Sequence, residues 1–204
     1  MTEVAIEYAH HFCPHCGTPN RDLGRIPFRC GACGFANFFG PCGAVGALVT
    51  NGQGQLLLVR RARDPERGKW GLPGGFVDRR ETVEQALARE VFEETQLSIS
   101  APLFLMSYPN DYRYGGIVVS VIDLFFVCQV EVDREIRLQE SELSEYRYVE
   151  RDSPLFDQMA FPSNRIAIEF WLSSTASREH GIDPLRRDSP RPDPSRPAGR
   201  SQTL

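Results

Sequence analysis

The sequence lacks any long uninterrupted apolar run. None of its hydrophobic stretches approaches the ~18 residues needed to span a bilayer, and the opening MTEVAIEYAHHFC lacks the basic-then-apolar pattern of a secretory leader. An excess of positive charge is also absent, because 23 Lys and Arg face 27 Asp and Glu. The formal net charge of −4 gives no overall reason to expect a membrane or nucleic-acid partner. We therefore expect a cytoplasmic protein with no membrane partner and regard nucleic acid as a minor alternative.

The cysteines do not have the pattern of a disulfide-stabilised protein. Four of the six form two Cys-x-x-Cys pairs, which are Cys13, Cys16, Cys30 and Cys33. In a chain without an export signal, this spacing is typical of a metal site. Because zinc prefers tetrahedral thiolate ligands, we predict a structural Zn²⁺ held by all four sulfurs, with no open position for catalysis. Cys42 and Cys128 stand alone and are predicted to be buried apolar residues.

Aliphatic residues are scarce in the first segment and in the last. Residues 1–40 are rich in Cys, Gly and Pro, which fits a small zinc ribbon that needs its metal. Residues 41–175 carry strong periodic patterns and form the main domain. Residues 176–204 mix Pro, Arg, Ser and Asp, so we predict a disordered tail.

The ribbon has two interpretations. Its three arginines could bind nucleic acid: Arg21, Arg25 and Arg29. Its five phenylalanines instead favour docking on the main domain or formation of a homodimer: Phe12, Phe28, Phe35, Phe38 and Phe39. We prefer docking or dimerisation to nucleic-acid binding.

The main domain alternates strands and helices. Two β-rich runs, 44–50 and 55–61, flank Asn51-Gly52-Gln53-Gly54, a strong hairpin signal. Further strands are predicted at 103–108, 117–130 and 146–149, and helices at 82–95 and 164–173. Strands with two interspersed helices indicate an α+β fold, of the α/β/α sandwich type.

The predicted helix at 82–95 concentrates negative charge. Thr82 is a plausible N-cap, with Gln85 as its capping-box partner. At about 100° per residue, Glu90, Glu93 and Glu94 share an arc of about 100°. A solvated acidic face is the simpler interpretation, but three like charges on adjacent turns repel one another. Oxygen ligands on a compact patch suit Mg²⁺ or Mn²⁺, which would relieve that repulsion.

The residues around this helix resemble the signature of the Nudix hydrolase family, Gly-x5-Glu-x7-Arg-Glu-U-x-Glu-Glu-x-Gly-U, with U a bulky aliphatic residue. The matching positions are Gly75, Glu81, Arg89, Glu90, Val91, Glu93, Glu94 and Leu97. Gln96 stands where the family has Gly, and Arg80 replaces a frequent Gly just outside the defined positions. A residue other than Gly at a helix C-terminus costs about 1 kcal/mol if positive φ is required, but no metal ligand is lost.

The resemblance implies a fold, a reaction and a set of site residues. The fold would be the Nudix α/β/α sandwich with a mixed sheet over residues 41–175. Glu90, Glu93 and Glu94, joined by the Gly75 carbonyl, would hold Mg²⁺ or Mn²⁺, while Arg89 and Glu81 would brace the loop. The enzymes of this family hydrolyse a nucleoside diphosphate linked to another moiety. The general base varies within the family, and here Glu90 and Glu94 in the signature, or Glu140, Glu142 and Glu145 outside it, are candidates.

The segment SYPNDYRYGG at 107–116 contains the predicted substrate-binding residues. We predict that Tyr112 and Tyr114 stack on a nucleobase and that Arg113 meets a phosphate. The same tyrosines, with Tyr108, could equally pack on the ribbon.

A ribbon before a Nudix domain is similar to two subgroups. The NADH pyrophosphatases carry a Ser-Gln-Pro-Trp-Pro-Phe-Pro-type string that is absent here. Another subgroup has an Ala-Phe element near its C-terminus, which FDQMAFPSNRIAIEFWL at 156–172 resembles, and it includes enzymes acting on FAD and ADP-ribose. We therefore favour ADP-ribose or FAD, with release of AMP, over NADH. Removal of an RNA cap and a non-catalytic nucleotide sensor are the remaining alternatives.

Overall fold

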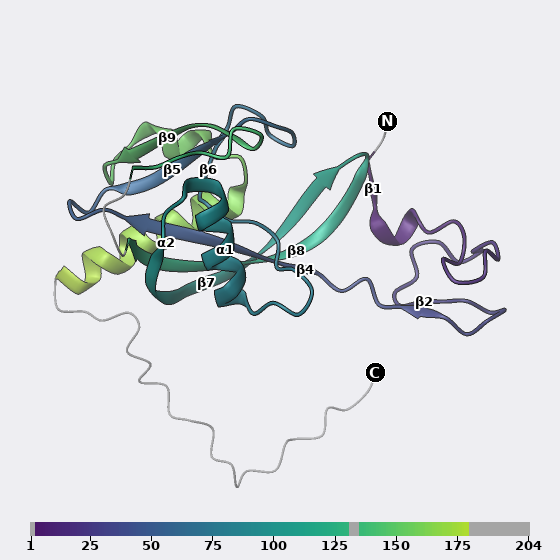
Figure 1. Ribbon diagram of the computed structural model, residues 1–204. Coiled ribbons are helices and arrows are strands. Elements are labelled where there is room, and N and C mark those ends of the chain that lie inside the picture. The colour runs from purple at the N-terminus through teal and green to yellow at the C-terminus, as the bar shows by residue number, and fades with distance from the viewer. Residues whose placement is uncertain (1–2, 131–134, 180–204) are drawn as a thin grey trace, which may run out of the picture.

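The computed structural model describes residues 3–130 and 135–179. A seven-stranded mixed sheet lies between two helices, which confirms the predicted α/β/α sandwich (Figure 1). The sheet contains β1 (Val4–Ala5), β4 (Cys42–Thr50), β5 (Leu56–Arg61), β6 (Trp70–Gly71), β7 (Ile99–Tyr114), β8 (Ile117–Val130) and β9 (Leu143–Val149). The helices are α1 (Val83–Thr95) and α2 (Pro162–Glu179), with 3₁₀ turns η1 (Ile6–Tyr8) and η2 (Pro154–Gln158).

The β8 strand connects parts of the chain that are far apart in sequence. It runs parallel to β4, from Cys42↔Val121 to Thr50↔Gln129, and antiparallel to β7. Its first residues also pair in parallel with β1. On the other side of β4, β5 pairs antiparallel with β4, β6 and β9. The predicted hairpin between β4 and β5 is confirmed, because the Asn51 carboxamide Oδ1 accepts hydrogen bonds from the backbone N–H groups of Gln53 and Gln55.

The two faces of the sheet bury two hydrophobic clusters. Side chains alternate along a strand, so neighbours such as Leu57 and Leu58 point to opposite faces. The face toward α1 packs Val45, Ala47, Val49 and Leu57 against Ala86, Leu87 and Val91. The face toward α2 packs Leu48, Leu58, Trp70 and Phe125 against Ala167, Ile168 and Trp171. The helices are thereby fixed on opposite sides of β4.

The helix α1 begins and ends as its sequence predicts. The Thr82 hydroxyl accepts from the Gln85 N–H, and the Gln85 side chain accepts from the Thr82 N–H, which completes the capping box. At the other end, Gln96 adopts φ 60, and Arg80 before the helix adopts φ 66. Both residues that replace family glycines therefore occupy the left-handed region, at a cost of about 1 kcal/mol each.

Two elements are longer than predicted. The segment 107–116 is not a connection between strands, because β7 continues to Tyr114 and the two-residue turn is Gly115-Gly116. Positive φ at both glycines is what a tight hairpin requires. The helix α2 runs to Glu179, past the predicted boundary at 175. The remainder of the predicted tail, 180–204, lies outside the described residues.

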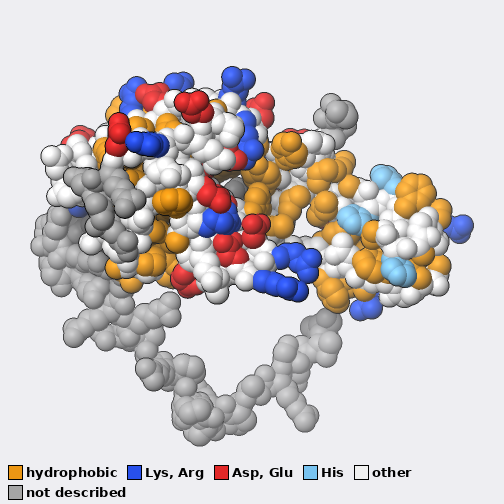
Figure 2. All heavy atoms as spheres, viewed as in Figure 1, with side chains coloured by type: hydrophobic (Ala, Val, Ile, Leu, Met, Phe, Trp, Pro, Cys, Tyr) orange, Lys and Arg blue, Asp and Glu red, His pale blue; other side chains and the backbone are white. Residues whose placement is uncertain are grey.

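The ribbon forms a small cluster of its own. Strands β2 (Phe28–Arg29) and β3 (Ala36–Asn37) pair, and Phe28 is buried with Cys13 and Cys30 while Phe35 and Phe39 pack against them. The prediction that the ribbon phenylalanines dock on the main domain or form a homodimer interface is therefore wrong for Phe28, which the ribbon itself buries. Phe12 and Phe38 are 61% and 66% exposed, and Figure 2 shows hydrophobic side chains spread over the ribbon surface.

The ribbon joins the main domain through the pairing of β1 with β8, beside the end of the β7–β8 hairpin (Figure 1). The lone cysteines differ from one another: Cys128 is buried as predicted, whereas Cys42 is exposed where β4 leaves the ribbon, so that prediction is wrong for Cys42.

Within residues 3–130 and 135–179, no helix combines the length and the apolar character that a membrane crossing demands.

Candidate active site

A cavity of about 370 Å³ opens between α1, the loop after β6 and the start of α2. The carboxylates Glu90, Glu93 and Glu94 form one part of its wall. The aromatic rings of Tyr112 and Phe161 form another part. The predicted carboxylate patch and one predicted tyrosine therefore share one cavity.

The loop Pro73–Val77 lies alongside β4 and requires glycine at position 74, while Gly75 passes close to the Glu90 side chain. The Val45 N–H donates to the Gly75 carbonyl at 2.8 Å, which leaves that oxygen one further lone pair. A Cβ on Gly74 would lie 2.1 Å from the Val45 oxygen. A Cβ on Gly75 would lie 2.5 Å from Oε1 of Glu90. The Gly-Gly pair thus lets the backbone approach both β4 and the α1 carboxylates.

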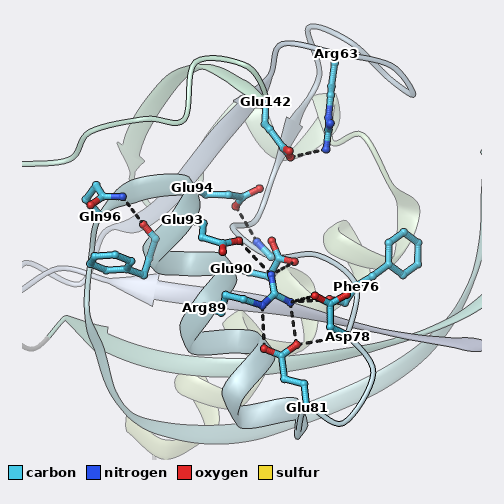
Figure 3. A network of polar contacts seen from close by, with 12 residues as sticks. Arg63, Phe76, Asp78, Glu81, Arg89, Glu90, Glu93, Glu94, Gln96 and Glu142 are labelled. Carbon is cyan, nitrogen blue, oxygen red and sulfur yellow. Dashed lines mark hydrogen bonds and ion pairs between the residues drawn. The ribbon is translucent and has the colours of Figure 1, made fainter.

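The three glutamates, whose side chains are drawn in Figure 3, differ in exposure. Glu94 is buried, and its Oε2 accepts from the Gly74 N–H at 2.9 Å. The Glu90 side chain is 17% exposed and that of Glu93 is 53% exposed. The patch therefore extends from the protein interior to solvent along one side of α1.

Arg89 ties the helix to the loop that precedes it (Figure 3). Its guanidinium donates to both carboxylate oxygens of Glu81, at 2.9 Å each, and to the Phe76 carbonyl at 3.1 Å. The same group donates to Glu90 at 2.9 Å and to Glu93 at 3.2 Å. A planar fork with several donors is suited to such bridging. These contacts are those of a brace, the role predicted for Arg89 and Glu81.

The electrostatics of the patch disfavour its negative charge. Burial, reinforced by the neighbouring carboxylates of Glu90 and Glu142, raises the pKa of Glu94 to about 8. Burial also raises the pKa of Glu90, although Arg89 opposes this. Glu81 is different, because its hydrogen bonds from Arg89 lower its pKa. A divalent cation would compensate the charge of Glu90 and Glu94, and carboxylate and carbonyl oxygens are ligands that Mg²⁺ accepts.

The carboxylates are less convergent than the ribbon cysteines. In the described part of the chain, the four cysteines are the group whose potential ligand atoms all lie within 4.8 Å of one another. The glutamates are instead drawn apart by Arg89 and by the Gly74 amide. Their donor chemistry fits Mg²⁺ or Mn²⁺, and binding would require Glu90 and Glu93 to turn from Arg89.

Of the predicted base candidates outside the signature, the structure brings Glu142 to the cavity. Its carboxylate pairs with Arg63 at 2.6 Å, above the α1 glutamates in Figure 3. Glu145 instead pairs with Arg60 and Arg147. Glu140 is exposed and does not line the cavity.

Of the three predicted substrate-binding residues, only Tyr112 lies in the cavity. Tyr112 lies in the cavity, with its ring centroid 5.1 Å from that of Phe76 and 6.0 Å from that of Phe161. Arg113 faces the other way along β7 and pairs with Glu3. Tyr114 is 68% exposed beside the hairpin turn. Neither Arg113 nor Tyr114 lines the cavity. Because side chains alternate along β7, Arg113 points to the face opposite Tyr112, whereas Tyr114 shares the face of Tyr112 but lies at the end of the strand.

Several cavity residues were missed by reasoning from sequence. They are Arg61, Arg63, Asn110, Asp123, Phe161 and Asn164. Arg61 adjoins both parts of the wall, since its guanidinium lies 5.3 Å from the Phe161 ring centroid and its charge lowers the pKa of Glu94. A signal existed for Asp123, which is a lone carboxylate inside the apolar run IVVSVIDLFFVCQV.

The sulfur atoms of the ribbon cysteines all lie within 4.8 Å of one another, and two of their separations match those around a tetrahedral zinc ion. The sulfur atoms of Cys13 and Cys33 lie 3.7 Å apart, and those of Cys16 and Cys30 lie 3.6 Å apart. Sulfurs about 2.3 Å from a central zinc would be about 3.8 Å from one another. Hydrogen bonds involving Thr18 lower the pKa of Cys16 to about 6, which favours the thiolate. All four thiols are free of disulfides.

The chain matches a family model, curated relatives and solved structures. The NUDIX domain model matches residues 40–170. A NAD-capped RNA hydrolase NudC from Haemophilus influenzae (strain PittGG) is 32% identical over 153 residues, covering 72% of this chain and 53% of that protein. An ADP-ribose pyrophosphatase from Methanocaldococcus jannaschii is 36% identical over 93 residues, covering 45% of this chain and 54% of that protein. The chain thus spans about half the length of these curated relatives. A NUDIX hydrolase structure from Nitrosomonas europaea superposes with TM-score 0.62 at 25% identity, covering 84% of this chain and 94% of that one.

Proposed function

The chain belongs to the Nudix family of hydrolases, and from this we propose that it cleaves the diphosphate bond of a nucleoside diphosphate linked to another moiety. We propose ADP-ribose or FAD as substrate and AMP as a product. The observation that carries the proposal is the single cavity that combines the α1 carboxylates with aromatic rings. Such a cavity suits a molecule with a charged centre and a flat apolar end.

The α1 carboxylates and the Gly75 carbonyl would hold Mg²⁺ or Mn²⁺. Glu94 and Gly75 are preorganised by the Gly74 and Val45 amides, while Glu90 and Glu93 would leave Arg89 to take part. Bound there, the cation would neutralise diphosphate charge and lower the pKa of a bound water. The raised pKa values of Glu90 and Glu94 support this assignment, since they indicate uncompensated negative charge.

Glu142 is our proposed general base. It lies in the cavity, and its carboxylate would accept the proton of the attacking water. Its partner Arg63 holds it in place, and Arg63 is also a cation that a substrate phosphate would attract. Arg61, beside both the carboxylates and Phe161, would position the diphosphate.

An adenine-containing substrate is supported by the cavity and by one relative. Tyr112 and Phe161 are placed so that a base could lie against a ring face. The relative named ADP-ribose pyrophosphatase aligns over 93 residues. ADP-ribose and FAD share the ADP half, so one aromatic site could serve both.

A second candidate substrate is the 5′ end of NAD-capped RNA. Relatives named NAD-capped RNA hydrolase favour it, and so do the exposed Phe12 and Phe38 of the ribbon, because unpaired bases stack on such rings. The same exposed rings could instead bury themselves against a second copy of the chain, as the homodimer prediction requires.

The ribbon would bind one structural Zn²⁺ through its four cysteines. The separations between the sulfur atoms support this. Free thiols persist in a reducing compartment, so the assignment agrees with a cytoplasmic location.

The proposal is tested by a substrate panel with Mg²⁺, containing ADP-ribose, FAD, NADH and NAD-capped RNA. Release of AMP is measured for the three small molecules, and release of nicotinamide mononucleotide is measured for the capped RNA, whose adenylate stays on the RNA. We expect ADP-ribose or FAD to be turned over with the highest kcat/KM. Glu93→Gln should lower kcat, whereas Glu84→Gln, an exposed glutamate at the start of the same helix, should not. If no compound is hydrolysed and Glu93→Gln alters only ligand affinity, the protein is a nucleotide sensor instead.

A further inference from the structure

Asp123 is a buried carboxylate that the proposed hydrolysis does not use. It lies on β8, between Val121 and Phe125 on the face toward α2, and is 8% exposed. It nevertheless lines the active-site cavity. A carboxylate so far from water costs free energy unless its oxygens are hydrogen-bonded.

The Asp123 carboxylate has two hydrogen-bond partners within the protein, the side chains of Ser163 and Asn110. The Ser163 hydroxyl, in the first turn of α2, donates to Oδ2 of Asp123 at 2.6 Å. If accepting these two bonds were the whole role of Asp123, a neutral acceptor such as Asn would serve and no charge need be buried. A carboxylate has two oxygens and about four acceptor sites, and this one borders the cavity, so it retains capacity for a donor on a ligand.

The residues around Asp123 indicate which kind of ligand would provide that hydrogen-bond donor. Tyr112 and Phe161 line the same cavity, with ring planes 34° apart, and present flat apolar surfaces. Asn110 also lines it, and hydrogen bonds from Asn110 and Ser163 oppose the effect of burial, which raises the pKa of Asp123. Aromatic rings that line the same cavity as a carboxylate and a carboxamide suit a heterocycle with mixed donors and acceptors.

We propose that Asp123 determines base specificity by accepting a hydrogen bond from the exocyclic amino group of adenine held beside Tyr112 and Phe161. The inference rests on the proposed function and narrows its substrate class. Adenine presents an amino donor next to a ring-nitrogen acceptor, which a carboxylate and a carboxamide match in turn. Hypoxanthine presents a carbonyl oxygen in place of the amino group, and that oxygen would face the Asp123 carboxylate unfavourably.

The first test needs no variant. The unmodified protein is offered ADP-ribose and its hypoxanthine counterpart with Mg²⁺, and binding of AMP and IMP is measured by calorimetry. We expect a preference for adenine of about 10- to 100-fold in kcat/KM and in binding. Equal treatment of the two bases in both measurements would overturn the inference.

The second test uses Asp123→Asn, which keeps the shape and an acceptor for Ser163 but supplies an amide donor. We expect kcat/KM for ADP-ribose to fall about tenfold or more and the ratio between the two bases to approach or pass unity. Asp111→Asn is the matched control, because Asp111 is exposed on the neighbouring strand and outside this cavity; its ratio should not change. An unchanged ratio in Asp123→Asn contradicts the role of Asp123.

The two proposals fail in different ways. If no diphosphate is hydrolysed while AMP still binds better than IMP and Asp123→Asn removes that difference, the proposed hydrolysis is wrong and the base site stands. If ADP-ribose is hydrolysed but neither base discrimination nor its dependence on Asp123 is found, the hydrolysis stands and the base site is wrong.

Discussion

Glu94 should make the metal-free protein less stable as the pH rises. Its pKa is raised from 4.5 to about 8 by burial and by nearby carboxylates. Between these values the folded state retains a proton that the unfolded state has lost, so the free energy of unfolding falls with increasing pH. Each pKa unit corresponds to about 1.4 kcal/mol, so a rise from 4.5 to about 8 lowers the free energy of unfolding by about 5 kcal/mol once the pH exceeds the pKa of the folded state. That is a large share of the stability of an ordinary domain.

Mg²⁺ should oppose this loss, because the cation compensates the ionised carboxylate. The assay is urea denaturation of the protein and of Glu94→Gln, from about pH 5 to about pH 8, with and without Mg²⁺. The metal is removed by dialysis and not with a strong chelator, which would also strip zinc from the ribbon. Glu94→Gln keeps an oxygen for the Gly74 N–H but cannot ionise.

The comparison between the two proteins isolates Glu94 from the other titrating groups. We expect the unmodified protein to lose stability with pH and to regain it with Mg²⁺, most strongly at the alkaline end. The Glu94→Gln variant should show a much smaller slope and a much smaller response to Mg²⁺. Parallel stability curves for the two proteins would refute the reasoning that the buried charge of Glu94 is uncompensated without a metal.

Three other substitutions test the site and the ribbon. Gly75→Ala should lower kcat about 10- to 100-fold, because its Cβ would displace the Glu90 carboxylate; Gly43→Ala, whose Cβ would lie 3.5 Å from its nearest neighbour, should retain activity in the same assay. Arg89→Lys should lose its paired hydrogen bonds to the loop, reducing stability by about 1–3 kcal/mol in denaturation and weakening Mg²⁺ binding in titrations; unchanged values for both would contradict the bracing role. Cys30→Ser should lower the zinc content measured by atomic absorption while hydrolysis of a small dinucleotide continues; retained zinc would exclude the four-sulfur site.

The sequence predicted most accurately those features that depend on residues close together in the chain. The capping box of α1 and the two Cys-x-x-Cys turns each depend on a few consecutive residues. The glutamate patch is similar, because helix geometry alone places those side chains on one side. Gln96 was also anticipated, since the chain requires positive φ where α1 ends.

The features that sequence reasoning missed depend on contacts between distant segments. Asp123 becomes a cavity residue because α2 brings Ser163 to within 2.6 Å of it, 40 positions later in the chain. The sequence predicts a connection at 107–116 and a substrate contact for Arg113, whereas β7 continues through this segment and directs Arg113 toward Glu3. Phe28 fills the small cluster of the ribbon and not an interface, which could not be deduced without the position of the cysteines.

The pairing of β8 with β4 bears on the order in which the protein folds during synthesis. The strand β4 cannot acquire its parallel neighbour until residues 121–129 have left the ribosome, and closing so long a loop is slow. The cysteines of the ribbon, by contrast, are all translated before β4, and their cluster needs nothing that follows residue 39. If the four cysteines bind zinc as we propose, we expect the nascent chain to bind the ion and form the cysteine cluster while the sheet is still being assembled.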